Sequence, residues 1–295
     1  MNKKKIDVYN LIKCEVEKLK KIGNKTASLD CRLLLSEILK TTNTVYTHQE
    51  VCISQNQIIK FQALVKKRLE GQPVSRILNR RNFWKSEFIL DEEILDPRPD
   101  SEILIESVLE YFSDKTQLLK ILDLGSGSGC LGLSLLGEYK NASITFVDVS
   151  KKSLKIVKRN SLQFSLKGKL KYINLDWHTH DWDTKLLNSG EKTKFDIIIT
   201  NPPYIPSNEI NFLEIEVRDY EPILALDGGN DGLDAYRSII PKLKNLLKSD
   251  GKIFIEIGKG QENLVSKTGL QNGLFLIEYK KDLSNINRVI IFNIK

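Results

Sequence analysis

The first seventy residues carry apolar side chains at helical spacing. Apolar positions recur every three to four residues in segments 7–20, 28–39 and 54–71, which is the pattern of helices with one buried face. The third segment begins with Ser54, and Gln57 stands where a capping box needs it. Short helices of this kind bury their apolar faces against one another, so the pattern predicts a small helical bundle.

The pattern of apolar residues changes at residue 119. Short apolar runs appear as LKILDLG, ASITFVDV, LKYINLD, FDIIITN and GKIFIEIG, and helix-like segments such as 151–163 and 233–248 separate most of them. Alternating strands and helices predict a parallel sheet with helices on both faces. The last two runs, LFLIEYKKDL and NRVIIFNIK, are joined by a short turn. They predict an antiparallel hairpin at one edge of that sheet.

The segment between these two regions has short apolar pieces around polar turns, as in PVSRILNRRNFWKSEFILDEEIL. This pattern favours a β-hairpin. The sequence therefore predicts an α/β protein with three parts: a helical bundle over residues 1–72, a β-hairpin linker over 73–97 and a sheet domain over 98–295.

Composition narrows the class of protein. The chain has 295 residues, 41% hydrophobic and 28% charged, which is typical of a soluble protein. No apolar run approaches the length of a membrane span, and the basic start MNKKKIDVYN leads into a charged amphipathic stretch rather than an apolar signal core. The four cysteines form no CxxC pair, so we expect reduced thiols and a cytoplasmic location. We expect no membrane association.

Charge and histidines add little. The net charge of +7 would suit an anionic partner, but much of it is lysine scattered along helices, for which a solvated face is the default. His178 and His180 form an HxH that could hold a metal; without a nearby cysteine or further histidine, an exposed polar loop is favoured, and we expect no metal site.

A glycine-rich loop follows the first strand of the sheet. In DLGSGSG, residues Gly125, Ser126, Gly127, Ser128 and Gly129 lie between a strand and a helix, where glycine lets the backbone turn sharply and approach a ligand. The spacing is GxGxG rather than the GxGxxG of dinucleotide enzymes.

Two further residues follow the next strands. Asp148 ends the second strand, where a carboxylate can accept both hydroxyls of an adenosine ribose. A helix cap is the other common role there, and Ser150 could fill it instead. Trp177, after the third strand, would suit a residue beside an adenine ring, although a packed core tryptophan is the alternative. The loop and Asp148 predict a nucleoside-bearing cofactor.

The fourth strand ends in the corner Asn201-Pro202-Pro203-Tyr204. Each proline biases the residue before it toward an extended conformation, so the corner is stiff before a substrate arrives. It would aim two acceptors, the Asn201 side-chain oxygen and the Pro202 carbonyl, at a planar –NH2 group, and Tyr204 would flank that group. A simple strand-ending turn is the alternative.

Such an arrangement suits methyl transfer to an amide or aromatic amine. The lone pair of that nitrogen is tied up in conjugation, and attack on a methyl group gives the nitrogen positive charge. Acceptors on both N–H bonds stabilise this charge, so catalysis rests on positioning and electrostatics, with no permanent general base.

The chain at this point resembles the class I S-adenosylmethionine-dependent methyltransferases, and more narrowly the release factor glutamine methyltransferases, which modify the glutamine of the Gly-Gly-Gln motif in peptide chain release factors. The motifs DCRLLLSEIL, DPRPDSE, DLGSGSG, LDW, NPPYI, EVRDYEPILALDGGNDGLDAYR and KDLSNINRVI carry the resemblance, in order, over nearly the whole chain. It implies a Rossmann-like, seven-stranded, mostly parallel sheet.

The resemblance also implies roles for individual residues. Residues 125–129 would wrap the methionine part of S-adenosylmethionine, Asp148 would bind the ribose and Trp177 the adenine. Asn201 would touch both cofactor and substrate, and the whole NPPY corner would hold the glutamine, with Asn201, Pro202 and Tyr204 as the catalytic residues. The N-terminal bundle would help to grip the release factor.

The chain departs from the usual family pattern in three places. RILN stands where YILG is common, Lys85 stands where a glycine often follows FW, and Cys130 replaces the usual alanine. Arg98 and Glu102 lie where the family's linker approaches the cofactor and receive no role.

Three functions follow as hypotheses. The first is methylation of the glutamine amide nitrogen (N5) of a release factor by a monomeric enzyme that does not bind nucleic acid directly. The second is methylation of exocyclic amines of DNA adenine or rRNA guanine, which NPPY and the positive charge permit; no target-recognition domain or aromatic-basic patch supports it. The third is a non-catalytic cofactor-binding module, which would have no use for an intact NPPY.

Overall fold

A computed structural model of the chain describes residues 3–41, 43–164, 170–189 and 194–294. The chain divides into two compact units, Met1–Arg80 with Glu214–Tyr220, and Arg81–Leu213 with Glu221–Lys295. Each unit has its own apolar core. The first unit therefore takes in a short segment that lies far along the chain.

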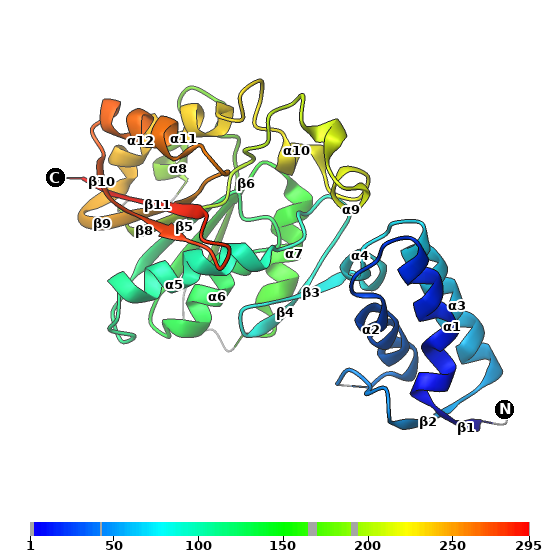
Figure 1. Cartoon of the computed structure of the whole chain (residues 1–295). Coiled ribbons are helices and arrows are strands. Elements are labelled where there is room, and N and C mark those ends of the chain that lie inside the picture. Colours follow the sequence, from blue (N-terminus) through cyan, green and yellow to red (C-terminus); the bar gives the residue numbers. More distant parts are fainter. Residues whose placement is uncertain (1–2, 42, 165–169, 190–193, 295) are drawn as a thin grey trace. The chain divides into compact units, whose positions relative to one another are not determined.

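The first unit is mainly helical (Figure 1). Its elements before residue 80 are β1 (Lys4–Asp7), α1 (Val8–Lys21), α2 (Ala27–Leu39), β2 (Glu50–Ile53), α3 (Gln55–Leu69) and α4 (Val74–Leu78). The three helices predicted from the apolar stripes are confirmed. Ser54 and Gln57 form the expected capping box, each side chain bonding to the backbone of the other residue, and this explains where α3 begins.

Three elements of this unit were not predicted. β1 and β2 pair antiparallel over four residues, with Lys4 opposite Ile53; strands this short leave little periodic signal. The expectation of a hairpin across all of 73–97 is wrong for Val74–Leu78, which is helix α4. Val74, Ile77 and Leu78 pack against the core of the unit, so burial decides the conformation of this five-residue segment.

The hairpin itself is present over a shorter range. β3 (Arg80–Phe83) and β4 (Ser86–Ile89) form a two-stranded sheet joined by Trp84 and Lys85. Trp84 has a φ of 54°, which a two-residue hairpin turn of the usual twist requires. The domain boundaries at 72/73 and 97/98 remain predictions.

The second unit is built on a seven-stranded sheet, as predicted. The strand order is β10-β11-β9-β8-β5-β6-β7, and β11 alone runs antiparallel to its neighbours. The bounds are β5 (Lys120–Leu124), β6 (Ser143–Asp148), β7 (Leu170–Asn174), β8 (Phe195–Thr200), β9 (Leu247–Glu256), β10 (Phe275–Lys281) and β11 (Asn287–Asn293). The predicted edge hairpin is the β10–β11 pair.

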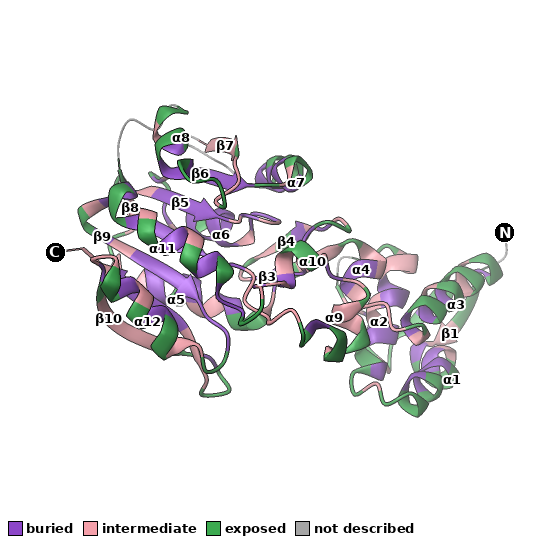
Figure 2. Ribbon diagram, turned by 90° about the horizontal axis from the view of Figure 1, so that it is seen from above, coloured by how far each residue is buried: buried purple, intermediate pink, exposed green. Residues whose placement is uncertain are grey.

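Helices cover both faces of this sheet (Figure 2). One core lies under α5 (Glu102–Tyr111), which follows directly on η1 (Pro99–Ser101), and under α6 (Cys130–Glu138) and α7 (Lys151–Ser161). The other lies under α8 (Trp182–Asn188), α11 (Asp234–Leu246) and α12 (Glu262–Gln271). Alternate residues of a strand serve opposite cores: Ile197 and Ile199 belong to the first, and Ile198 to the second. Continuous apolar runs such as FDIII are explained by this two-sided burial.

The chain between β8 and β9 contains three short helices, η2 (Ile210–Phe212), α9 (Ile215–Arg218) and α10 (Ile223–Leu226). After the NPPY corner, Ile205 forms a bridge with Asp227, and its amide donates to the carbonyl of Leu226 (3.0 Å). The segment around 224–228 is thereby held alongside the corner. Within the described ranges, no helix combines the length and apolar character needed to cross a membrane.

An ion triad with a buried centre, Arg68 and Asp30, and a more exposed third member, Glu216, ties α9 to the rest of the first unit. Arg68 Nε lies 2.7 Å from Asp30 Oδ2, and Arg68 Nη2 lies 2.5 Å from Glu216 Oε1, with the Arg68 and Asp30 side chains each 8% exposed. Removing the arginine would leave a buried carboxylate without its main counter-charge.

We expect Arg68→Ala to lower the free energy of unfolding by about 3–5 kcal/mol, because Asp30 is left buried and uncompensated. Urea denaturation measures this. Arg218→Ala is the control: its ion pair with Asp219 is exposed, and its loss should cost under about 1 kcal/mol. The double variant Arg68→Ala/Asp30→Ala should be less destabilised than Arg68→Ala; a greater loss would contradict the explanation.

Candidate functional site

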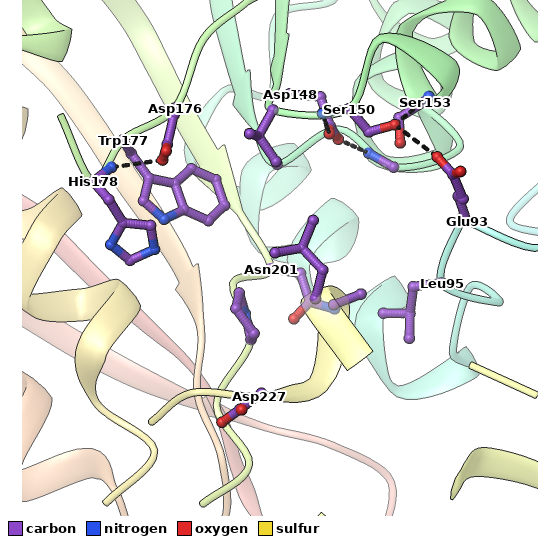
Figure 3. Close-up of a pocket in the computed structure, with 16 residues that line it drawn as sticks. Glu93, Leu95, Asp148, Ser150, Ser153, Asp176, Trp177, His178, Asn201 and Asp227 are labelled. Atoms are coloured by element: carbon purple, nitrogen blue, oxygen red, sulfur yellow. Dashed lines mark hydrogen bonds between the residues drawn. The ribbon is translucent and has the colours of Figure 1, made fainter. Parts of the chain in front are cut away.

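A pocket opens at the carboxyl edge of the parallel strands, where ligands of open α/β sheets bind. It brings together six of the predicted site residues from four separate loops: Gly125, Gly127, Asp148, Trp177, Asn201 and Pro203. Figure 3 shows Asn201 at the centre of this pocket, with Trp177 on one side and Leu95 on the other.

The glycine loop forms one wall of the pocket. The amides of Gly125 and Ser126 donate to the carbonyl of Val147 (2.9 and 3.1 Å), which ties the loop to the end of β6. Gly125 has a φ of 75°, and a Cβ built on it would lie 2.9 Å from Cη2 of Trp177. Only glycine allows both this left-handed turn and the close approach of the indole.

The other three loop residues do not line the pocket. The Ser126 hydroxyl donates to the carbonyls of Asp123 and Val147, both at 3.1 Å. Ser128 is buried and its hydroxyl accepts from the Cys130 amide (3.3 Å). Gly129 donates its amide to the Ser126 carbonyl (2.7 Å). These contacts shape the loop; direct contact of these residues with a cofactor remains a prediction.

Asp148 orients the loop with its carboxylate. Oδ2 accepts from the Gly127 amide (2.9 Å), and Oδ1 accepts from the Ser150 amide (2.8 Å). Burial raises the pKa of Asp148, and these backbone hydrogen bonds oppose the rise. Ser150 is the cap of α7, so the carboxylate is not needed as a helix cap and each of its oxygens keeps a second lone pair for a ligand.

Trp177 lies three residues beyond the end of β7 at Asn174 and is half-buried. Its indole covers Gly125, and His178 packs edge-on against it (Figure 3). His178 also lines the pocket, and its Nδ1 lies 3.0 Å from the Ser238 hydroxyl. A flat ring beside an open pocket is the surface that an adenine base would stack on.

The four residues of the NPPY corner differ in whether they line the pocket. Asn201 and Pro203 line the pocket, whereas Pro202 is buried and Tyr204 packs against the apolar core. Asn201 Nδ2 donates to the hydroxyl of Ser101 (3.2 Å). Since the nitrogen is engaged there, the Asn201 oxygen is the half of the amide left to face a ligand.

Tyr204 is held from behind the corner. Its hydroxyl donates to Glu256 Oε1 (3.3 Å), and its carbonyl accepts from Gln261 Nε2 (2.9 Å). Burial raises the pKa of Tyr204 well above its usual value, so the phenol is neutral and acts as a donor.

Several pocket residues escaped the sequence reasoning. Glu93 and Leu95 come from the segment after the hairpin, and Leu224, Ala225 and Asp227 come from the segment around α10. No periodic or glycine signal marks them. The backbone pairing of 205 with 226–228 is what brings the second group to the pocket, and that pairing is visible only in three dimensions.

Arg98 and Glu102 have structural partners. Arg98 Nη2 lies 3.4 Å from Oε1 of the buried Glu221, whose Oε2 accepts from the Asp96 amide (3.0 Å). Glu102 Oε1 accepts from the Trp84 amide (2.7 Å) in the tight hairpin turn. Neither residue lines the pocket.

Replacement of Gly125 by alanine tests the close packing of the loop. We expect a loss of roughly 2–4 kcal/mol in the free energy of unfolding, since the new Cβ adds overpacking against Trp177 to the cost of the left-handed φ. Gly260→Ala is the matched control: its φ is 83° with nothing within 4 Å of an added Cβ, so only about 1–2 kcal/mol should be lost. Equal losses, measured by thermal denaturation, would speak against the indole contact.

Two family models match different parts of the chain. The family model "PrmC N-terminal domain" matches residues 11–78, and the model "Methyltransferase small domain" matches residues 99–215. A solved structure of a protein-(glutamine-N5) methyltransferase (release factor-specific) from Alicyclobacillus acidocaldarius is 23% identical, with a TM-score of 0.42, over 68% of this chain and 94% of that one.

Curated relatives extend over almost the whole chain. The bifunctional methyltransferase of Rickettsia felis is 32% identical over 94% of this chain, but the chain spans only 56% of that relative's length. The release factor glutamine methyltransferase of Caulobacter vibrioides is 35% identical over 93% of this chain and 92% of its own length. At this identity and mutual coverage, the chain belongs to the release factor glutamine methyltransferase family.

Proposed function

We propose that this chain transfers a methyl group from S-adenosylmethionine to the side-chain amide nitrogen (N5) of the glutamine in the Gly-Gly-Gln motif of peptide chain release factors. The observation that carries the proposal is the Asn201 amide, which faces the pocket with its nitrogen bound to Ser101 and its oxygen available. Methyltransferases that act on DNA adenine or rRNA guanine share the NPPY motif, but the similarity to the relative from Caulobacter vibrioides favours glutamine as the substrate.

The residues around the pocket fit S-adenosylmethionine. Gly127 has a φ of 53° and open space where a Cβ would stand, so a ligand can approach the backbone there. Asp148 has lone pairs for the ribose hydroxyls, and Trp177 offers an aromatic face for the adenine. Bound there, S-adenosylmethionine would supply an electrophilic methyl group on a positively charged sulfur.

The chain's own contribution is positioning and charge stabilisation. The Asn201 oxygen and the Pro202 carbonyl would accept the two N–H bonds of the glutamine amide, holding its nitrogen in place as it gains positive charge. The methylated nitrogen would then lose one proton to water, so no buried base is required.

Incubation with S-adenosylmethionine carrying a labelled methyl group, together with a release factor, tests the activity. We expect one methyl group per release factor, located by mass spectrometry on the Gly-Gly-Gln glutamine and absent when that glutamine is replaced by alanine. Label on nucleic acid instead, or none on the glutamine, would reject the proposal.

The separate roles of Asn201 and Asp148 are testable by substitution. Asn201→Ala should lower kcat by about 10²–10³ while leaving the cofactor Kd within about threefold, because the lost acceptor acts on the developing charge. Asp148→Ala should raise the cofactor Kd about tenfold or more. Calorimetry measures the cofactor Kd of each variant, and single-turnover kinetics measures the rate of methyl transfer.

Asn141→Ala is the control, since Asn141 is exposed, precedes β6 at the opposite edge of the sheet, and its side chain bonds to the Thr116 carbonyl, away from the pocket. Equal weakening of cofactor binding by Asn201→Ala and Asp148→Ala would contradict the roles assigned to them.

A further inference from the structure

Glu221 is a buried carboxylate that joins two loops of the second unit. Its side chain is 1% exposed. Oε2 accepts from the Asp96 amide (3.0 Å), and Oε1 lies 3.4 Å from Nη2 of Arg98. Asp96 directly follows Leu95 in the chain, and Glu221 directly precedes Pro222, the N-cap of α10. A buried carboxylate is costly to keep, so its place between two distant segments calls for an explanation.

Each of the two loops that Glu221 joins supplies a wall of the pocket. Leu95 lines the pocket from the segment after the hairpin, and Leu224 and Ala225 line it from α10. Both segments lie between strands of the sheet rather than within it, so strand pairing does not set the distance between them. The hydrogen bond from the Asp96 amide to Glu221 connects the two walls instead.

The other end of α10 is held against the residue that follows the NPPY corner. The Ile205 amide donates to the Leu226 carbonyl (3.0 Å), and the Gly228 amide donates to the Ile205 carbonyl (2.8 Å). Ile205 also forms a bridge with Asp227. The helix is therefore anchored at both ends, at its start by Glu221 and after its last residue by Ile205.

A third contact closes a ring around one side of the pocket. Asn201 Nδ2 donates to the hydroxyl of Ser101 (3.2 Å), which lies five residues after Asp96 in the chain. The three contacts and the chain segments between them form the ring. Figure 3 shows Leu95 across Asn201 from Trp177, the residue expected to stack on the adenine. The residues of the ring or next to it that line the pocket, called here the substrate rim, are Leu95, Asn201, Pro203, Leu224, Ala225 and Asp227.

We propose that Glu221 is a positioning residue, which holds the substrate rim together so that the segment carrying the substrate glutamine docks on it with the side-chain amide at Asn201. This inference rests on the proposed function. Leu224 lines the pocket and is nevertheless 66% exposed, so it is accessible to a bound protein. An aliphatic wall suits a glycine-rich segment, because glycine carries no Cβ and its backbone can approach closely. A rim that is already in place spares the complex the cost of ordering it.

The first test is steady-state kinetics with the release factor varied at saturating S-adenosylmethionine. Glu221→Ala should raise the KM for the release factor about tenfold, with kcat and the cofactor Kd each within about threefold, because the loosened rim must be ordered on binding while the cofactor pocket keeps its residues. Glu221→Gln should stay within about threefold of the wild-type KM, since an amide oxygen can still accept from the Asp96 amide.

Asp183→Ala is the matched control. Asp183 is also a buried carboxylate; it accepts from Asn245 Nδ2 (2.8 Å), lies 3.6 Å from Lys242 Nζ, and ties α8 to α11 away from the pocket. Its loss should leave the KM for the release factor unchanged. An equal rise in KM for Asp183→Ala and Glu221→Ala would reflect general destabilisation and overturn the positioning role.

A surface variant keeps the proposal testable if Glu221→Ala fails to fold. Leu224→Ala removes part of the rim at an exposed position and should raise the KM for the release factor about three- to tenfold. Ile223→Ala is its control, because Ile223 is exposed on the same helix but does not line the pocket. Both Glu221→Ala and Leu224→Ala act through one wall, so the double variant should raise KM by less than the product of the single effects.

The second test needs no turnover. The amides of Ala225 and Asp227 donate to the carbonyls of Pro222 and Ile223, both at 2.9 Å, so hydrogen exchange at these amides reports opening of α10. Glu221→Ala should speed their exchange at least about fivefold, because the start of the helix loses its anchor. The control Asp183→Ala should exchange at the wild-type rate.

The two tests separate the possible failures. If the wild type does not methylate a release factor, the proposed function is overturned, and the exchange rates still decide whether Glu221 holds the rim. If the wild type methylates the release factor but Glu221→Ala folds and keeps the wild-type KM, or if Leu224→Ala and Ile223→Ala have the same KM, the positioning role alone is overturned.

Discussion

The hydrogen bond from Asn201 Nδ2 to Ser101 is the contact on which the candidate site depends. An asparagine amide has two nearly identical ends with opposite hydrogen-bonding character, and the backbone of a stiff corner does not choose between them. The nitrogen end is bonded to a serine on η1, one hundred residues earlier in the chain, at the start of the segment that leads into α5. The NPPY motif is contiguous in the sequence, but the orientation of its asparagine amide depends on a hydrogen bond to a residue from a distant element.

The parallel sheet explains why such distant residues meet. Strands β5, β6, β8 and β9 all end at one edge, so the residues that follow them lie close together although tens of residues separate them in the chain. Two-sided burial of FDIII in β8 fixes the strand through both cores, and the Thr200 hydroxyl donates to the Leu124 carbonyl (2.7 Å) at its last residue. The corner that follows therefore begins from a rigid point.

Sequence patterns predicted the parts of this structure that have a local cause. Period and capping revealed α1, α2 and α3, and apolar runs revealed the sheet. GxGxG, Asp148, Trp177 and NPPY revealed four of the loops at the pocket. They did not reveal α4, whose residues adopt a helix because the core covers them, nor the approach of Leu224 and Ala225, which depends on backbone pairing with residue 205. They also treated the NPPY residues as a group, whereas burial separates Asn201 and Pro203 from Pro202 and Tyr204.

Three buried carboxylates at this edge show why residue type alone did not assign roles. Asp123 Oδ2 accepts from the Gly132 amide (3.0 Å) in the first turn of α6, Asp148 holds the glycine loop, and Glu256 holds the corner. Burial raises the pKa of both Asp123 and Glu256 to about 7, but their donors differ: a backbone amide keeps its hydrogen in one direction, whereas a hydroxyl can rotate. A change of charge at Asp123 alters only the strength of a fixed contact. At Glu256 the donor is the hydroxyl of Tyr204, which can rotate, so the same change there can reorient the hydrogen of its neighbour.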